Sequence, residues 1–318
     1  MNRGGAWRLL RLAIAVGLTA YILWRSDPRQ VWQLAAAAHW RWIACAVLLV
    51  LLDRALMAWR WMVLLCALTP GSRPPFGAVL RIFFVSTFVG SFLPSLAGDL
   101  YRAYSLSRLR VSGLEAAASV IMDRALGVVS MVLVAALALG FARALIDLPG
   151  VLPIVLIASL GCALVAAGLY SEKVAALGLG VARALPGTMA KRLATGIIDA
   201  VRRYAAHHGE LTTVLVLSIG VQVLRVLQAW CLGLAIGLTA PLWAYFVFIP
   251  LIVIVMQIPI TVSGLGTSQL AFDLFFSQVG VTSPEAIALS ILFVALALVG
   301  NLPGALLYVT VPARESAR

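Results

Sequence analysis

An interrupted apolar run between residues 76 and 110 limits the fold more than any other part of the sequence. Its apolar half, 76–93, meets Pro94 before it is long enough to cross a bilayer, and Gly98 and Asp99 follow shortly after. Irregular backbone at membrane depth survives only where protein or a water-filled cavity satisfies its polar groups. The pattern therefore predicts a re-entrant helical hairpin, with an ordinary spanning helix and a cytosolic loop as the alternative.

A second segment of the same design covers residues 247–280. Its apolar half ends at Pro259, and a polar, glycine-rich turn precedes a second apolar run. The turn contains Thr261, Ser263, Gly264, Gly266 and Thr267. Paired interrupted segments in corresponding halves of a chain indicate the substrate site of a transporter that is built from repeats.

Composition places these segments in a membrane. The mean hydropathy is +1.03, and 63% of the residues are hydrophobic while only 11% are charged. The excess of 24 Lys and Arg over 12 Asp and Glu indicates basic cytoplasmic loops and contact with anionic lipid headgroups rather than nucleic acid. The four cysteines and three histidines show no spacing typical of a metal or redox site, so no metal or cofactor is expected.

The distribution of charge predicts the topology. If both hairpins return to the side from which they enter, six spanning helices remain, and all strongly basic segments lie in the cytoplasm, including both termini. The spans are expected near 9–24, 43–68, 115–141, 151–170, 211–238 and 285–311. The chain then forms one transmembrane domain, 1–318, in the inner (cytoplasmic) membrane. This is an all-α polytopic fold in which 9–141 and 151–311 form an inverted repeat with two re-entrant hairpins.

The stretch 171–210 is the long polar segment of the sequence and is expected to be cytoplasmic. Within it, apolar residues recur at helical spacing from Met189 to Tyr204, among several Lys and Arg. This pattern is typical of a basic amphipathic helix on the inner leaflet. A solvated connecting helix is the alternative interpretation.

Eight ionisable residues fall inside apolar segments, where each costs a few kcal/mol and usually marks function. They are Asp53, Arg54, Arg60, Asp99, Arg102, Asp123, Arg124 and Arg225. Structural pairing is the alternative to function: Asp99 with Arg102, Asp53 with Arg225 or Arg124, and Asp123 with another Arg. Five Arg against three Asp nevertheless leave a surplus of two positive charges.

Unpaired guanidinium groups in a bilayer require an anion, and Arg binds phosphate through two parallel hydrogen bonds. Arg225, in mid-helix between Gln222 and Gln228, is the first phosphate-ligand candidate, and Arg102 is the second. Helix starts at Gly98–Asp99 and at Gly266–Thr267 offer backbone N–H groups, although Asp99 opposes an anion unless Arg102 neutralises it. The full predicted substrate-binding set is Arg225, Arg102, Asp99, Arg54, Arg124, Asp123, Ser95, Gly98, Ser263, Gly264, Gly266 and Thr267. No residue is predicted to be catalytic.

Three stretches carry a family resemblance: SFLPSLAGDLYRAYSL, EAAASVIMDRALGVVSM and IPITVSGLGTSQLAF. They resemble the lysylphosphatidylglycerol synthase transmembrane (flippase-like) family, over nearly the whole chain. The resemblance implies a flippase-like membrane region. Because the chain ends at Arg318 without the soluble aminoacyl-transfer domain of the best-known members, synthase activity is not expected. Stand-alone members are similar to proteins associated with hopanoid or glycolipid export.

The leading expectation is a lipid flippase or transporter and not an enzyme. It would move an anionic lipid, such as a phospholipid or a polyprenyl-phosphate-linked glycolipid, with the phosphate on Arg225 and Arg102 between the hairpin tips. Asp99 or Asp123 could carry a proton if a gradient drives transport. The alternative is a membrane enzyme or accessory subunit that acts on a lipid phosphate in glycolipid or hopanoid biosynthesis. Its carboxylates would be Asp99 and Asp273, which lie on different hairpins.

Overall fold

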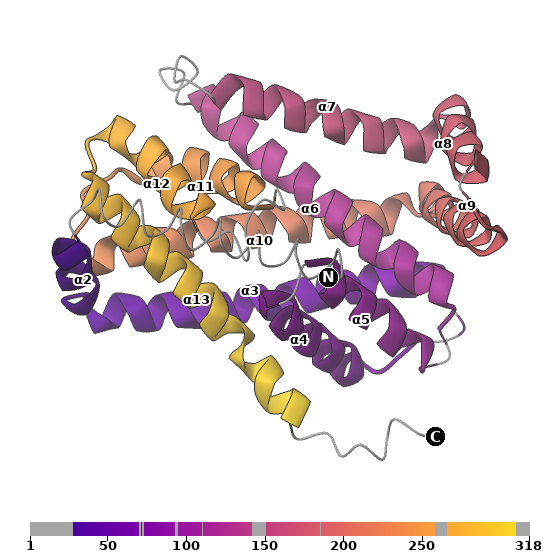
Figure 1. Ribbon diagram of the computed structural model, residues 1–318, viewed down its shortest axis with the longest axis horizontal. Coiled ribbons are helices and arrows are strands. Elements are labelled where there is room, and N and C mark those ends of the chain that lie inside the picture. The colour runs from indigo at the N-terminus through magenta and orange to yellow at the C-terminus, as the bar shows by residue number, and fades with distance from the viewer. Residues whose placement is uncertain are drawn as a thin grey trace, which may run out of the picture.

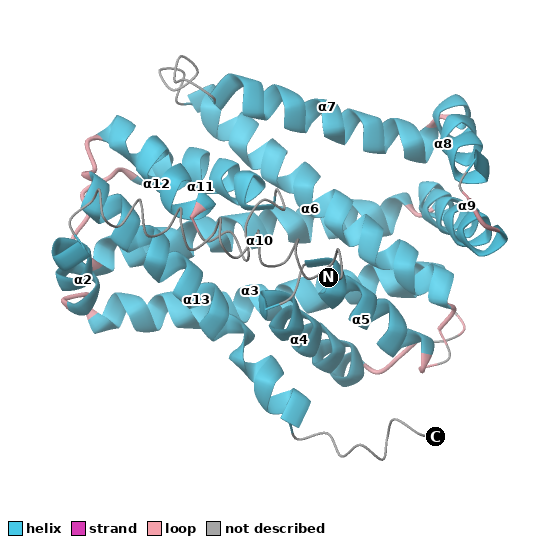
Figure 2. Cartoon of the chain, in the orientation of Figure 1, coloured by secondary structure: helices cyan, strands magenta, loops and turns pink. Residues whose placement is uncertain are grey.

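The computed structural model describes residues 28–69, 71, 73–92, 95–109, 111–141, 151–184, 186–257 and 266–309. All regular elements in these ranges are helices (Figure 2). The longer helices are α3 (Trp40–Leu68), α6 (Gly113–Phe141), α7 (Val151–Tyr170), α10 (His208–Ala235) and α13 (Ser283–Val309). The shorter ones are α2 (Pro28–Ala36), α4 (Phe76–Phe92), α5 (Ser95–Ser107), α8 (Glu172–Ala184), α9 (Thr188–Arg203), η2 (Tyr204–Ala206), α11 (Leu242–Gln257), α12 (Thr267–Phe276) and η3 (Ser277–Val279).

Four helices, α3, α6, α10 and α13, are long and apolar enough to cross a bilayer. Helices α7 and α8 meet that test only as a pair, and they are bent by 92° at their junction, so the described chain has four or up to five spans. The predicted helix at 9–24 lies outside the described residues. The structure therefore confirms an all-helical, multi-pass membrane protein.

Both predicted hairpins contain an apolar helix too short to span. Helix α4 has 17 residues and α11 has 16, whereas a bilayer core requires about 20. Each contacts the short helix that follows it, α5 or α12. Gly98 permits the close approach of α5 to α4, because a Cβ there would lie 2.6 Å from the carbonyl oxygen of Ser86. Pro94, Pro259, Ser263 and Gly264 lie outside the described residues.

Each short helix pair belongs to its own hydrophobic cluster. Helices α11 and α12 pack with α10 and α13 around aromatic rings in contact, in which Phe276 stacks on Phe272 and meets Phe248 edge to face. Helices α4 and α5 pack with α3 and α6 around Trp61 and Phe83. The two clusters hold the pairs in different parts of the bundle: Figure 1 places α12 near the end that carries α2, and α4 and α5 in the other half.

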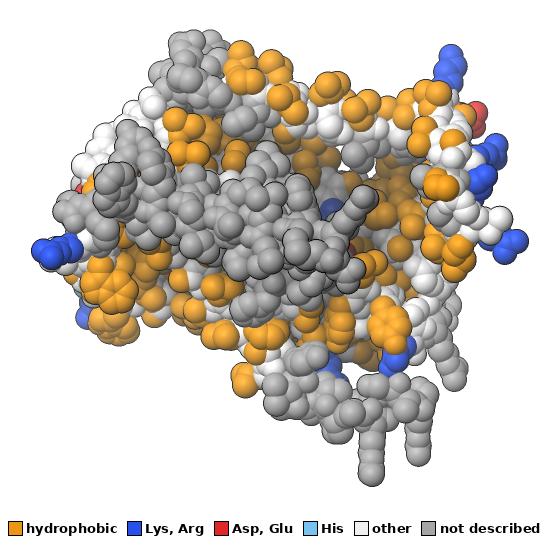
Figure 3. Space-filling view, in the orientation of Figure 1, with side chains coloured by type: hydrophobic (Ala, Val, Ile, Leu, Met, Phe, Trp, Pro, Cys, Tyr) orange, Lys and Arg blue, Asp and Glu red, His pale blue; other side chains and the backbone are white. Residues whose placement is uncertain are grey.

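The predicted amphipathic helix is present as α9. Its apolar residues Met189 and Leu193 are exposed, while the hydroxyl of Tyr204, immediately after α9, donates a 2.9 Å hydrogen bond to the carbonyl of Leu64 in α3. Burial raises the pKa of the Tyr204 phenol above its ordinary value, so it is neutral at physiological pH. In Figure 3, basic side chains gather at the end formed by α8 and α9, and apolar side chains cover α7.

Candidate functional site

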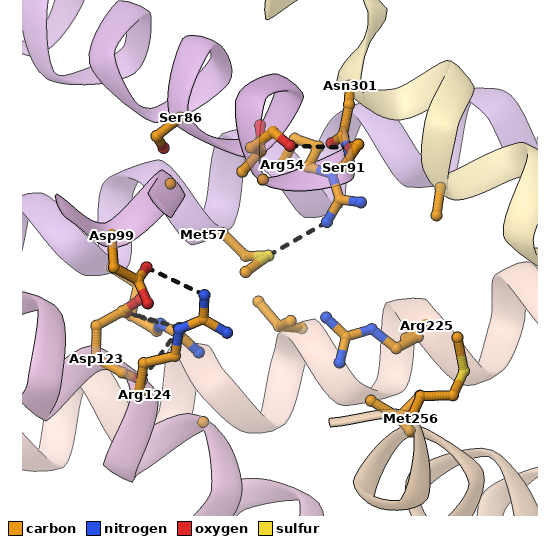
Figure 4. A pocket seen from close by; sticks show the side chains of 18 of the residues that line it. Arg54, Met57, Ser86, Ser91, Asp99, Asp123, Arg124, Arg225, Met256 and Asn301 are labelled. Atoms are coloured by element: carbon orange, nitrogen blue, oxygen red, sulfur yellow. Dashed lines mark hydrogen bonds and ion pairs between the residues drawn. The ribbon is translucent and has the colours of Figure 1, made fainter. Parts of the chain in front are cut away.

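A cavity of about 360 Å³ lies where seven helices meet (Figure 4). Its walls come from α3, α4, α5, α6, α10, α11 and α13, so both arms of the first predicted hairpin and one arm of the second contribute. The charged residues in its wall are Arg54, Arg60, Arg102, Arg124, Arg225, Asp99 and Asp123. The structure thus gathers in one place seven of the eight ionisable residues that the sequence singles out. The eighth, Asp53, binds Arg54 from outside the wall.

Asp123 is the centre of a buried network that joins five helices, α3, α4, α5, α6 and α10. Its carboxylate lies 2.6 Å from Nη2 of Arg60 and 3.6 Å from Nη1 of Arg102. Arg60 also donates to the hydroxyl of Ser218, at 3.1 Å. Arg102 donates through Nε to Ser86, at 2.8 Å, and its guanidinium lies 4.5 Å from the ring centre of Phe83. These contacts hold both guanidinium groups in fixed positions.

A second ion pair joins the two sides of the cavity at a more exposed point. Nη2 of Arg124, on α6, lies 3.0 Å from Oδ1 of Asp99, on α5, and the Arg124 side chain is 47% exposed. An exposed pair of this kind contributes little stability, at most about 1 kcal/mol. Arg124 can therefore exchange the carboxylate for another anion at small cost.

Arg54, on α3, pairs with its neighbour Asp53 at 3.1 Å and donates to the sulfur of Met57. Two atoms of this pair, Nε of Arg54 and Oδ1 of Asp53, are buried without a hydrogen-bond partner in the described part of the chain. A buried donor left unsatisfied costs about 1–3 kcal/mol. Arg54 therefore retains hydrogen-bonding capacity inside the cavity.

Arg225, on α10, differs from the other four arginines. Its guanidinium donates to the side-chain oxygen of Gln222 at 3.2 Å, and Gln222 in turn donates to Ser130 at 3.1 Å. It forms no ion pair with any carboxylate that the structure describes. Figure 4 shows the side chains of Arg54, Arg124 and Arg225 directed toward the middle of the cavity from three helices. Three cationic forks that converge can bind the oxygens of a phosphate.

The ion pairs differ from those that sequence spacing suggested. Asp99 binds Arg124 instead of Arg102, and Asp53 binds the adjacent Arg54 instead of Arg225 or Arg124. The reason is that Arg102 turns toward Ser86 and Asp123, which leaves Asp99 to face α6. The pairing of Asp123 with another Arg is confirmed, and it binds two.

The N-terminus of α12, in the second hairpin, lies outside the cavity wall. Gly266 and Thr267 are not part of the cavity wall, to which α11 instead contributes Val253 and Met256. The backbone N–H of Gly266 is already bonded to the side chain of Gln269, at 2.6 Å. Gly98 does line the cavity, beside α4. Ser95 begins α5.

Sequence analysis missed the polar contribution of α13. Asn301 is 8% exposed and lines the cavity, where its amide nitrogen donates to Ser91 of α4 at 2.8 Å. Its side-chain oxygen is buried without a partner among the described residues. The signal is present in the sequence, because Asn301 interrupts the largely apolar run of 285–311, but an uncharged amide is a weaker signal than an ionisable side chain.

Fold and site together define a polytopic helical membrane protein with an arginine-rich cavity between short, paired helices. The family model described as "Lysylphosphatidylglycerol synthase TM region" matches residues 8–304. The chain therefore belongs to this family, as its motifs indicated, and the family links it to lipid-related functions in the membrane. The comparison with curated proteins found no match.

Proposed function

We propose that this protein is a flippase that moves an anionic lipid between leaflets, a phospholipid or a polyprenyl-phosphate-linked glycolipid. The observation that carries the proposal is Arg225, a guanidinium on the apolar helix α10 that faces a shared cavity and has no carboxylate partner in the described structure. A charge inside the membrane without a counter-charge destabilises the protein, and such charges therefore usually mark a functional site. A lipid phosphate supplies the missing anion and both hydrogen-bond acceptors.

The architecture that we propose around this site has six spanning helices and two re-entrant hairpins in an inverted repeat. Two observations support it: α4 and α11 are too short to span, and each packs on its following helix. Figure 1 also places α12 and α9 at opposite ends of the long axis. Hairpins that enter from opposite faces would bring their tips to a midplane site, as in transporters that rock two repeats around a substrate.

In this proposal the headgroup enters the cavity while the acyl or prenyl tail stays in lipid. The phosphate meets Arg225 and Arg54, and it displaces Asp99 from Arg124 because that pair is exposed and weak. Rocking of the halves then exposes the cavity to the other leaflet. The driving force is the concentration difference of the lipid or an ion gradient, with Asp99 or Asp123 as the proton carrier in the latter case.

We favour transport over catalysis because the two carboxylates that a hairpin-tip enzyme would use have separate partners. Asp99 pairs with Arg124 at the cavity, and Asp273 accepts a hydrogen bond from Ser283, the first residue of α13. We further propose that the protein resides in the inner membrane with both termini in the cytoplasm, and that its partners are the lipid substrate and the membrane.

Reconstitution into vesicles tests the proposal. Vesicles that contain fluorescent anionic lipids and the purified protein should lose inner-leaflet fluorescence to an external quencher, and Arg225→Gln should slow this loss at least about tenfold, as expected for one charge-assisted bond. Arg41→Gln is the matched control, because Arg41 is an exposed residue of α3 outside the cavity. Equal rates with and without wild-type protein would refute the proposal. Conversion of the lipid to a new species, seen by mass spectrometry, would favour the enzyme.

A further inference from the structure

The charge of the cavity indicates how much negative charge its ligand carries. Five arginines line it, and three carboxylates lie against them: Asp99 and Asp123 in the wall and Asp53 beside Arg54. Two positive charges are therefore left without a carboxylate. They lie among apolar helices, where an uncompensated charge is far more costly than at a surface.

The surplus can be assigned to particular residues. Arg54 and Arg124 each have one carboxylate of their own. Asp123 is shared between Arg60, at 2.6 Å, and Arg102, at 3.6 Å, so its charge balances only one of them, and the closer contact is to Arg60. The second uncompensated charge is Arg225. One surplus charge therefore lies on α5, in the first hairpin, and the other on α10.

Neutral partners already fill part of the hydrogen-bonding capacity of these two arginines. Arg102 donates to Ser86 and lies over Phe83, and Arg225 donates to Gln222. Those contacts orient the guanidinium groups without neutralising them. A ligand with one negative charge would leave the cavity with one positive charge, and a ligand with two would bring it to zero.

We propose that the ligand is a lipid whose phosphate headgroup carries two negative charges, a phosphomonoester or a diphosphate, and that a single phosphodiester is a poor substrate. A phosphomonoester carries about −1.5 to −2 charges at pH 7, whereas a phosphodiester carries one. This inference rests on the flippase function proposed above and specifies its substrate class. Arg225 and Arg102 select by total charge, and Arg54 and Arg124 add hydrogen bonds to the phosphate oxygens.

Binding to the purified full-length protein in detergent tests the inference apart from transport. The probes are short-chain phosphatidic acid and farnesyl diphosphate, whose headgroups can each carry two negative charges, against short-chain phosphatidylglycerol, which carries one. The two doubly charged probes should each bind at least about tenfold more tightly than phosphatidylglycerol, as expected for one additional charge-assisted contact. Comparison of the two identifies monoester or diphosphate as the better source. Inorganic phosphate and diphosphate, added alone, show whether the lipid tail is needed.

Charge subtraction supplies the decisive variant. Arg225→Gln leaves the cavity with only one positive charge in excess of its carboxylates. The preference for doubly charged probes over phosphatidylglycerol should then fall about tenfold or more, because phosphatidic acid loses one charge-assisted contact. Arg41→Gln removes the same charge from an exposed position outside the cavity and should leave the preference unchanged. If Arg225→Gln fails to fold, Arg225→Lys keeps the charge and should keep the preference.

The two proposals fail in different ways. Wild-type protein that moves phosphatidylglycerol as fast as phosphatidic acid, and binds both equally, would overturn the charge inference while the flippase function stands. Tight, selective binding of doubly charged lipids without movement between leaflets would overturn the flippase function and keep the inference. An equal fall in the affinity of Arg225→Gln for every probe would also overturn the inference. It would mean that Arg225 does not distinguish singly charged from doubly charged headgroups.

Discussion

Arg60 and Asp123 form the most deeply buried ion pair that the structure describes, with 2.6 Å between Nη2 and Oδ1 and both side chains less than 5% exposed. The pair joins α3 to α6, and Arg60 extends it to Ser218 on α10. Asp123 at the same time holds Arg102 of the first hairpin. One carboxylate thus fixes the relative positions of three long helices and the hairpin that closes the cavity.

Asp123→Asn should therefore unfold the protein far more readily than a typical substitution. It removes the counter-charge of two buried arginines, and breaking such a pair costs about 3–5 kcal/mol. The measurement is thermal or denaturant unfolding of the purified protein in detergent. Asp199→Asn is the matched control, because Asp199 is exposed on α9 and should tolerate the change. Equal stability of the two variants would show that Asp123 is not the anchor.

Gly98 should resist substitution for a different reason. A Cβ at this position would lie 2.6 Å from the carbonyl oxygen of Ser86, so alanine would push α5 away from α4. Overpacking of this kind costs about 1–3 kcal/mol. Gly77→Ala, on α4, is the control, since nothing lies within 4 Å of its Cβ position. Unfolding in detergent should separate the two variants, and a stable Gly98→Ala protein would mean that the hairpin arms can move apart freely.

Many of the residues that line the cavity could be predicted from the sequence. The free-energy cost of placing a charge in an apolar segment is large, and it can be recognised from the segment alone. A charged residue in an apolar run needs a polar environment wherever the run lies, so the eight ionisable residues were expected to face the interior of the bundle. Short apolar helices that end at Pro and Gly likewise predict paired arms without any knowledge of packing. These two signals were sufficient to predict Arg54, Arg102, Arg124 and Arg225 as parts of one site.

The partners within the site could not be predicted in the same way. An arginine side chain reaches several neighbours, and its choice depends on how each helix is rotated. Spacing suggested Asp99 with Arg102 because both lie on one helix, but Arg102 turns to Ser86 and Asp123 on other helices. Asn301 was missed because an amide carries no charge and so gives no strong signal in an apolar run.

Asp99→Asn should strengthen anion binding. The carboxylate of Asp99 occupies Arg124 at 3.0 Å and repels any phosphate in the same cavity. Removing its charge frees Arg124 and raises the excess of positive charge in the cavity by one, so phosphate lipids should bind several-fold more tightly. The free energy of unfolding should change by less than about 1 kcal/mol, because the ion pair is exposed. Lipid titration in detergent measures the affinity. Weaker binding would show that Asp99 contacts the ligand directly.

The proposed topology predicts labelling from opposite sides. On a background without the four native cysteines, a cysteine at Gln278, in η3, should react with an impermeant reagent added outside the cell. A cysteine at Lys191, in α9, should react only after the membrane is opened. Both positions are exposed, and Figure 1 places α9 and α12, which η3 follows directly, at opposite ends of the molecule. Reaction of both in intact cells would contradict the inverted repeat with a cytoplasmic α9.

Arg225 provides the sharpest test of transport. Its guanidinium contacts Gln222 at 3.2 Å and no described carboxylate, so its loss breaks no described ion pair. Arg225→Ala should therefore fold as well as the wild type, yet abolish flipping of phosphate lipids in vesicles. Arg225→Lys keeps the charge but loses the two-pronged fork, and its rate should fall about tenfold, the effect of one charge-assisted hydrogen bond. Gln222→Ala, which removes only the orienting contact, should lie between Arg225→Lys and the wild type. If Arg225→Ala instead loses stability in parallel with transport, Arg225 supports the fold, and the phosphate must bind elsewhere in the cavity.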